Sequence, residues 1–104
     1  MEAVVVYITA PNEEEAARMA AALVEERLAA CVNIVKNIRS IYRWEGKTED
    51  ETEVLMIAKT RRGLFDRLLR RVRELHSYTV PEVIAMPVIA GSEDYLRWVE
   101  EVTG

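Results

Sequence analysis

The sequence is poor in the residues from which most catalytic and metal sites are built. It contains a single cysteine, Cys31, and a single histidine, His76. One cysteine excludes a disulfide within the chain and every Cys-x-x-Cys metal or redox motif. The chain also lacks a Ser-His-Asp constellation and a glycine-rich phosphate loop, so we expect a protein without enzymatic activity.

Long apolar runs are also absent. No stretch approaches the ~18 consecutive apolar residues of a membrane-spanning helix. The first residues lack the basic segment and long apolar core of a secretory signal. A lone thiol agrees with a reducing compartment. We therefore expect a cytoplasmic protein that makes no contact with a membrane.

The chain does contain enough apolar residues for one packed core. Half of its 104 residues are hydrophobic and 31% are charged, with a formal net charge of −4. This length corresponds to one domain, residues 1–104. Since the chain is acidic, nucleic-acid binding would require a local basic patch, and we expect no nucleic-acid partner.

The first part of the chain predicts a strand followed by a helix. Residues 4–9 form a β-branched apolar run, which is typical of a strand buried on both faces. Asn12 stands three residues before Glu15, a plausible capping pair, and apolar residues then recur at helical spacing. We expect the helix to span about 13–28.

The middle of the chain predicts two strands. Between 32 and 44 apolar and polar residues alternate, which indicates a half-buried strand with a bulge near Lys36 and Asn37. Residues 45–51 are glycine-containing and acidic, and we expect them to form the turn. The apolar run within 53–60 then predicts a central strand.

The last part predicts a helix over 63–75, a connector over 76–81, a strand over 82–86 and a short helix over 92–102. The order β-α-β-β-α-β-α indicates an α+β fold. Its first six elements match the ferredoxin-like βαββαβ sandwich, whose antiparallel sheet has the first and third strands in the middle. The final helix is an addition to that arrangement.

The predicted strand over 32–44 is too long for the domain. At ~3.3 Å per residue it spans roughly 40 Å, whereas a compact domain of this size is about 33 Å across. The hairpin that it forms with the next strand should therefore project beyond the core and carry Tyr42 and Trp44 with it. These aromatics are either core residues or part of an interface, and a closed homo-oligomer would bury them.

The remaining candidate residues each have two interpretations. His76, in the connector, either satisfies carbonyl groups at a helix end or binds a metal ion. Cys31 is either a small buried residue or a nucleophile. The arginines of 61–73 form either a solvated helix face or a nucleic-acid site. The acidic residues of 45–53 either lie in a solvated turn or hold a hard cation loosely.

Several segments together resemble the CutA divalent-ion-tolerance family, over nearly the whole chain and in order. The most specific segment is Ser-Ile-Tyr-Arg-Trp-Glu-Gly-Lys at 40–47. The other matching segments are Thr-Ala-Pro at 9–11, Ala-Cys-Val-Asn at 30–33, Glu53-Val54 with Lys59-Thr60, His76 with Tyr78, Pro-Glu-Val at 81–83 and Asp94-Tyr95-Leu96 with Trp98. The resemblance implies a ferredoxin-like subunit, a homotrimer, a cytoplasmic location and a role tied to copper and other divalent ions.

The resemblance also bears on the site residues. Copper ligands proposed in the family are a cysteine in the first strand and one or two histidines before the last strand. Those positions hold Ile8, Leu75 and His76 here, so the resemblance implies at most a weak copper(II) site at His76 and no tightly bound cofactor. Cys31 matches a family cysteine that we interpret as a structural thiol.

The sequence therefore predicts a trimeric, non-enzymatic protein of the CutA type. An alternative is a PII-like regulatory module that binds a small molecule in clefts between subunits, and a purely structural trimer is a third class. We expect the intersubunit surface to include Tyr42, Trp44, Lys59, Tyr78 and Glu82.

Overall fold

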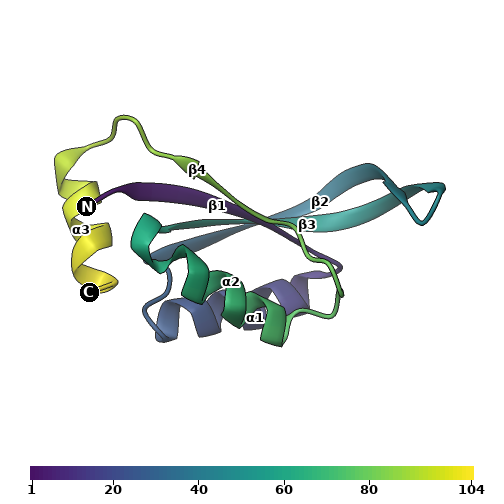
Figure 1. Ribbon diagram of the computed structural model, residues 1–104, viewed down its shortest axis with the longest axis horizontal. Coiled ribbons are helices and arrows are strands. Elements are labelled where there is room, and N and C mark those ends of the chain that lie inside the picture. The colour runs from purple at the N-terminus through teal and green to yellow at the C-terminus, as the bar shows by residue number, and fades with distance from the viewer.

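The computed structural model describes all residues 1–104 and has the predicted α+β architecture (Figure 1). The elements are β1 (Ala3–Ala10), α1 (Glu13–Glu25), β2 (Cys31–Trp44), β3 (Lys47–Arg61), a 3-10 turn (Arg62–Leu64), α2 (Phe65–Leu75), β4 (Val83–Pro87) and α3 (Glu93–Val102). The four strands form one antiparallel sheet in the order β2-β3-β1-β4. This confirms the ferredoxin-like prediction that the first and third strands lie in the middle.

The core lies between the sheet and the helices α1 and α2, which lie on the same side of it (Figure 1). The even-numbered residues of β1, and those of β3 from Val54 to Thr60, point into this layer and are buried. Ile8 and Met56 of the sheet and Leu23 and Leu68 of the helices are fully buried there. Each such side chain contributes roughly 1.5–3 kcal/mol through burial of apolar surface.

The opposite face of the sheet is covered by a helix only at one end, where α3 contacts β3. The odd-numbered residues of β1, among them Val5 and Tyr7, stay partly exposed, as do Leu55 and Ile57 on β3. The prediction that residues 4–9 are buried on both faces is therefore wrong for the single chain. Their continuous apolar character is typical of a strand covered on both sides, so this face carries more apolar surface than an open sheet needs.

Helix α1 begins at the predicted residue and ends three residues early. The Asn12 side chain accepts a hydrogen bond from the Glu15 backbone N–H at 2.8 Å, which caps the helix. Arg27 adopts a positive φ of 60°, and the Leu28 N–H donates to the Leu23 carbonyl at 2.9 Å. This Schellman arrangement stops the helix and turns Leu28 back onto the core, which explains its helical spacing.

The two long strands β2 and β3 form a hairpin that projects from the sheet (Figure 1). Its turn consists of only Glu45 and Gly46, both with positive φ, as a two-residue type I′ turn requires. The prediction that the turn extends to residue 51 is therefore wrong. Residues 47–52 continue β3 as a strand, because acidic residues in a solvated ribbon carry no alternating apolar signal.

A bulge divides the hairpin from the rest of the sheet. The register shifts between Val35 and Ile38, and Asn37 has a φ of 57°, which confirms the predicted irregularity. Because β2 has one extra residue at the bulge, its even-numbered residues lie on one face of the sheet before the bulge and on the other face after it. Ile34 therefore faces the helices, whereas Tyr42 and Trp44 face the opposite side, although all three have even numbers.

The molecule is elongated, with principal extents of 44 × 25 × 22 Å. The hairpin tip forms one end, and α3 lies at the other end beside both termini (Figure 1). The Arg61 guanidinium joins α3 to β3 by donating a hydrogen bond to the Thr103 carbonyl at 2.8 Å.

None of the helices has both the length and the apolar composition required to span a membrane. The last strand begins one residue later than predicted, at Val83.

Candidate functional site

A cleft of about 900 Å³ lies beside the projecting hairpin. One wall consists of the β2–β3 ribbon, and the other is the segment 77–82 that links α2 to β4. Tyr42, Trp44, Tyr78 and Glu82 all line it, so the structure brings together four of the five residues predicted for an intersubunit surface.

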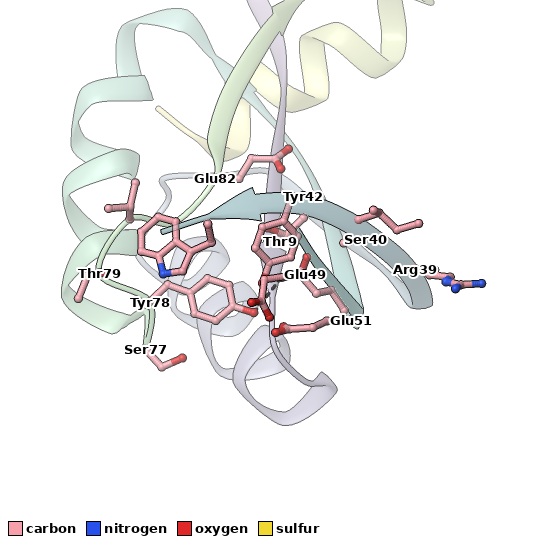
Figure 2. Close-up of a pocket in the computed structure, with 14 residues that line it drawn as sticks. Thr9, Arg39, Ser40, Tyr42, Glu49, Glu51, Ser77, Tyr78, Thr79 and Glu82 are labelled. Carbon is pink, nitrogen blue, oxygen red and sulfur yellow. Dashed lines mark hydrogen bonds between the residues drawn. The ribbon is translucent and has the colours of Figure 1, made fainter. Parts of the chain in front are cut away.

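Carboxylates dominate the ribbon wall. Glu49, Glu51 and Glu53 alternate along β3 and all line the cleft. Figure 2 shows the first two of them, Glu49 and Glu51. The only cationic side chain in the lining is Arg39, which points away in Figure 2. Its guanidinium forms a bidentate pair with Asp50 at 2.9 and 2.6 Å, which lowers the pKa of that carboxyl. The cleft is therefore strongly acidic.

Two tyrosines stand among these carboxylates. The Tyr78 hydroxyl donates a hydrogen bond to Glu53 at 2.8 Å, joining the two walls. Burial raises the pKa of Tyr78 far above its ordinary value, and the hydrogen bond to Glu53 and its charge add to the effect. Burial and the neighbouring Glu51 raise the pKa of Tyr42 as well. Both phenols therefore remain protonated at every physiological pH.

His76 lies directly behind this cleft with its side chain fully buried. Its Nε2 lies 2.7 Å from the Thr9 carbonyl oxygen, and its Nδ1 accepts the Tyr78 backbone N–H at 3.0 Å. The neutral tautomer with the proton on Nε2 satisfies both contacts. His76 therefore holds the start of the 77–82 wall against the end of β1. The imidazole thus satisfies a backbone carbonyl, as one interpretation predicted, but that carbonyl belongs to Thr9 of β1 and not to the end of α2.

Glu15 provides a second anchor for the same segment. Its carboxylate accepts hydrogen bonds from the Ser77 backbone N–H at 3.0 Å and from the Ser77 hydroxyl at 2.9 Å. It also lies 3.4 Å from Nδ1 of His76. The sequence pattern indicated a helix-capping pair for this residue, but its side chain reaches across to the α2–β4 connector instead. Nothing in the local sequence identifies that partner.

The structure leaves no ring nitrogen of His76 free to bind a metal ion. Both ring nitrogens are already engaged, so an ion could bind only after one of these hydrogen bonds opens. No three histidine, cysteine or acidic side chains converge on a common point. Copper ligation by His76 stays a prediction.

Cys31 and Lys59 lie away from the cleft, opposite each other at the start of β2 and the end of β3. The Lys59 ammonium donates to the Asn33 side chain, which the Cys31 thiol also approaches at 3.9 Å. Cys31 is half-buried and has no histidine near it in the fold. Its surroundings match the structural interpretation rather than the nucleophilic one.

The basic segment 61–73 covers the end of β3, the 3-10 turn and most of α2. Arg67, Arg70 and Arg73 are exposed, while Arg71 pairs with Glu26 at 2.9 Å. The central strands β1 and β3 offer no exposed aromatic platform beside this face. These features favour the solvated-face interpretation.

We accordingly expect no measurable affinity for nucleic acid at physiological salt. The net negative charge opposes phosphate binding, and only scattered arginines are available. The check is a fluorescence-anisotropy titration with duplex DNA and single-stranded RNA. A strong interaction that weakens steeply with added salt would contradict the expectation.

The comparisons with known proteins agree with one another. Residues 4–102 match the family described as CutA1 divalent ion tolerance protein. The Divalent-cation tolerance protein CutA of Thermus thermophilus is 53% identical over 96% of this chain and 97% of its own. A solved structure titled Periplasmic divalent cation tolerance protein CutA, from Archaeoglobus fulgidus, has a TM-score of 0.95 and 45% identity, with 98% of this chain and 99% of that one covered.

Some relatives are longer than this chain. The chloroplastic Protein CutA of Arabidopsis thaliana is 49% identical over 96% of this chain, but the match covers only 55% of that protein. The chain therefore spans about half the length of this plant relative.

Proposed function

Because the chain belongs to the CutA1 divalent ion tolerance protein family, we propose that it acts as a homotrimer in tolerance to copper and other divalent cations. It catalyses no reaction of its own and binds metal weakly. The projecting hairpin is the observation that supports a homotrimer. Its residues Ile41, Tyr42 and Trp44 are large, apolar and exposed in the single chain.

The open face of the sheet supports the same assembly. Tyr7 and Ile57 lie side by side in the register on the face opposite α1 and α2, and both are partly exposed. A second copy could supply both the missing layer on this face and the contacts of the hairpin. A closed ring of identical contacts buries these surfaces in every subunit. Three is the number of subunits that the family resemblance implies.

Light scattering coupled to size exclusion tests the assembly at micromolar protein concentration. We expect a mass three times that of the 11.9 kDa chain. A monomer with an intact circular-dichroism spectrum would contradict the proposal, since the hairpin would then be stable without a partner.

We expect copper(II) to bind with micromolar or poorer affinity and to require His76. Opening the Tyr78 N–H bond to Nδ1 would leave a partly buried donor unpaired, which costs about 1–3 kcal/mol and weakens binding accordingly. Calorimetric titration of the wild type, of His76→Gln and of Cys31→Ser measures the effect. Binding should vanish in His76→Gln, whose amide can still reach Thr9, and persist in Cys31→Ser.

Two results would contradict this metal prediction. Nanomolar stoichiometric binding in the wild type would require converging ligands that the single chain does not hold. Unchanged binding in His76→Gln would place the ion elsewhere.

We place the protein in the cytoplasm as part of this proposal. Its one thiol is free, as a reducing compartment allows. Relatives carry the names chloroplastic and periplasmic, so the compartment is a property to be measured for each member. Fractionation of source cells, with detection by antibody, provides the measurement.

A second candidate function is the binding of a small regulatory molecule. The observation that favours it is the cleft, whose volume of about 900 Å³ lies in the range of ligand pockets. A thermal-shift screen would detect such a ligand, because binding to the folded state raises its stability.

A further inference from the structure

We propose that the Lys59 ammonium of one subunit enters the cleft beside the hairpin of the next subunit and pairs there with Glu53. This inference rests on the proposed homotrimer and names the polar contact that fixes how its subunits fit together. It follows from two charges that lack a counter-ion within the chain and from the apolar surface that lies between them.

Glu53 is a charged side chain that the single chain buries without a cation. It is only 6% exposed and belongs to the lining of the cleft. Its one hydrogen bond comes from the neutral Tyr78 hydroxyl at 2.8 Å, and it takes part in no salt bridge. The other carboxylate oxygen accepts no hydrogen bond and is not sealed from the cleft. Since carboxylates are almost never buried to this extent unless they are paired, Glu53 lacks a cation.

Lys59 presents the complementary case on the same strand. It is half-buried, and its ammonium donates only to the neutral Asn33 side chain. No carboxylate of the chain forms a salt bridge with it. Arg61, the other cation on this face of β3, already donates to the Thr103 carbonyl. Lys59 is therefore the cation of the open sheet face that lacks an anion.

The two charges share a face of β3 but cannot reach each other within one chain. Six residues separate Glu53 from Lys59, and this even number places both side chains on the face opposite α1 and α2. At ~3.4 Å per residue, their attachment points are about 20 Å apart along the strand. A salt bridge requires its nitrogen and oxygen within about 4 Å. The pair can therefore form only between two copies of the chain.

Apolar side chains occupy the stretch of sheet between the two charges. Leu55 and Ile57 lie between them on β3, and Tyr7 lies beside Ile57 on β1; all three are partly exposed. A subunit that covers this surface also removes water from the charges at its two ends. A desolvated ion is strongly unfavourable unless an opposite charge compensates it. The covering subunit must therefore supply a cation to Glu53 and an anion to Lys59, and an identical chain carries both.

A ring of three identical subunits suits this arrangement. Each subunit of such a ring uses two different patches, one toward each neighbour. Glu53 lies on β3 toward the projecting hairpin and Lys59 toward α3, so each subunit offers an anion at one end of the open face and a cation at the other (Figure 1). A neighbouring copy thus brings to the cleft the one predicted interface residue, Lys59, that lies away from it within the chain.

A double-mutant cycle on the stability of the assembly tests the pair. The variants are Glu53→Gln, whose amide oxygen can still accept the Tyr78 hydroxyl, Lys59→Met, which keeps an unbranched side chain, and the two combined. Light scattering over a dilution series at a fixed urea concentration gives the protein concentration at which half of the trimer has dissociated.

Each single variant should raise this concentration about thirtyfold or more, because three pairs are lost per trimer and each contributes about a factor of ten. The combined variant should dissociate no more readily than either single variant, since neither charge is then left without its partner. Circular dichroism checks that each variant keeps the subunit fold. Unfolding of Lys59→Met, whose ammonium contacts only Asn33 within the subunit, would contradict the intersubunit role.

The matched control is Lys47→Met. Lys47 also lies six residues from Glu53 on the same face of β3, but in the other direction, exposed at the hairpin tip. Its effect should simply add to that of Glu53→Gln. Additive effects of Lys59→Met and Glu53→Gln would overturn the proposal. An equally strong coupling of Glu53 with Lys47 would overturn it too, because the attraction would then be one of overall charge.

The same measurements separate this inference from the proposed homotrimer. A trimer without coupling between Glu53 and Lys59 refutes the pair and leaves the assembly intact. A dimer that shows the coupling supports the pair and refutes the number of subunits. A monomeric wild type refutes the assembly and the pair together.

Discussion

Replacing Trp44 by alanine should dissociate the assembly while leaving the subunit folded. Trp44 is 44% exposed at the end of the hairpin and is not part of the buried core, so the subunit loses little when its ring is removed. If each ring is buried on assembly, its loss costs about 3–5 kcal/mol per subunit. Light scattering over a dilution series should show smaller species at concentrations where the wild type remains trimeric.

The chain offers a matched control for this experiment. Trp98 is the other tryptophan, with 40% exposure, and its ring packs at a tilt against Tyr95 of α3, away from the hairpin. The Trp98→Ala variant removes the same side chain at nearly the same exposure and should assemble as the wild type does. Loss of the folded subunit in Trp44→Ala, or equal dissociation in both variants, would contradict the role assigned to the hairpin tip.

The second large effect is expected for His76→Ala. This change leaves the Thr9 carbonyl and the Tyr78 N–H without partners and opens a cavity where the buried ring lay. Each unpaired buried group costs about 1–3 kcal/mol, so we expect a loss of about 3 kcal/mol or more in the free energy of unfolding. Urea denaturation followed by circular dichroism measures it, with protein concentration held constant because assembly adds to stability.

A second variant tests whether the hydrogen bonds or the volume of the ring matter more. His76→Gln can keep a donor for the Thr9 carbonyl and should recover part of the loss. Glu15→Gln should weaken the same segment, because a neutral amide accepts the two Ser77 hydrogen bonds less strongly than a carboxylate does. A loss below about 1 kcal/mol in His76→Ala would show that the segment 76–78 is held by other contacts.

The arrangement of the sheet could be predicted from the sequence, because each central strand has its own apolar signature. The runs at 4–9 and 54–58 indicated the two middle strands, and Asn12 correctly placed the start of α1. The end of that helix was missed, because Leu28 continues the apolar spacing although the chain has already turned at Arg27. The spacing of apolar residues indicates which side chains are buried, but it does not show whether the backbone at those residues is still helical.

The hairpin contains features that the sequence pattern did not predict. Residues 47–52 are all polar, so neither alternation with apolar residues nor an apolar run marks them as a strand. The bulge near Asn37 was predicted, yet its consequence for the facing of Tyr42 requires the actual pairing with Glu49. The cleft could be anticipated only as a list of residues, because its two walls meet through tertiary contacts between Tyr78 and Glu53.

The order of the strands also has a consequence for synthesis on the ribosome. β1 leaves the ribosome first but pairs with β3 on one side and with β4, the last strand made, on the other. The β2–β3 ribbon needs only its own two-residue turn and can close within about 1–10 μs of its release. The nascent chain therefore carries a finished hairpin and an unfinished sheet, and β1 keeps one edge unpaired until β4 has been synthesised.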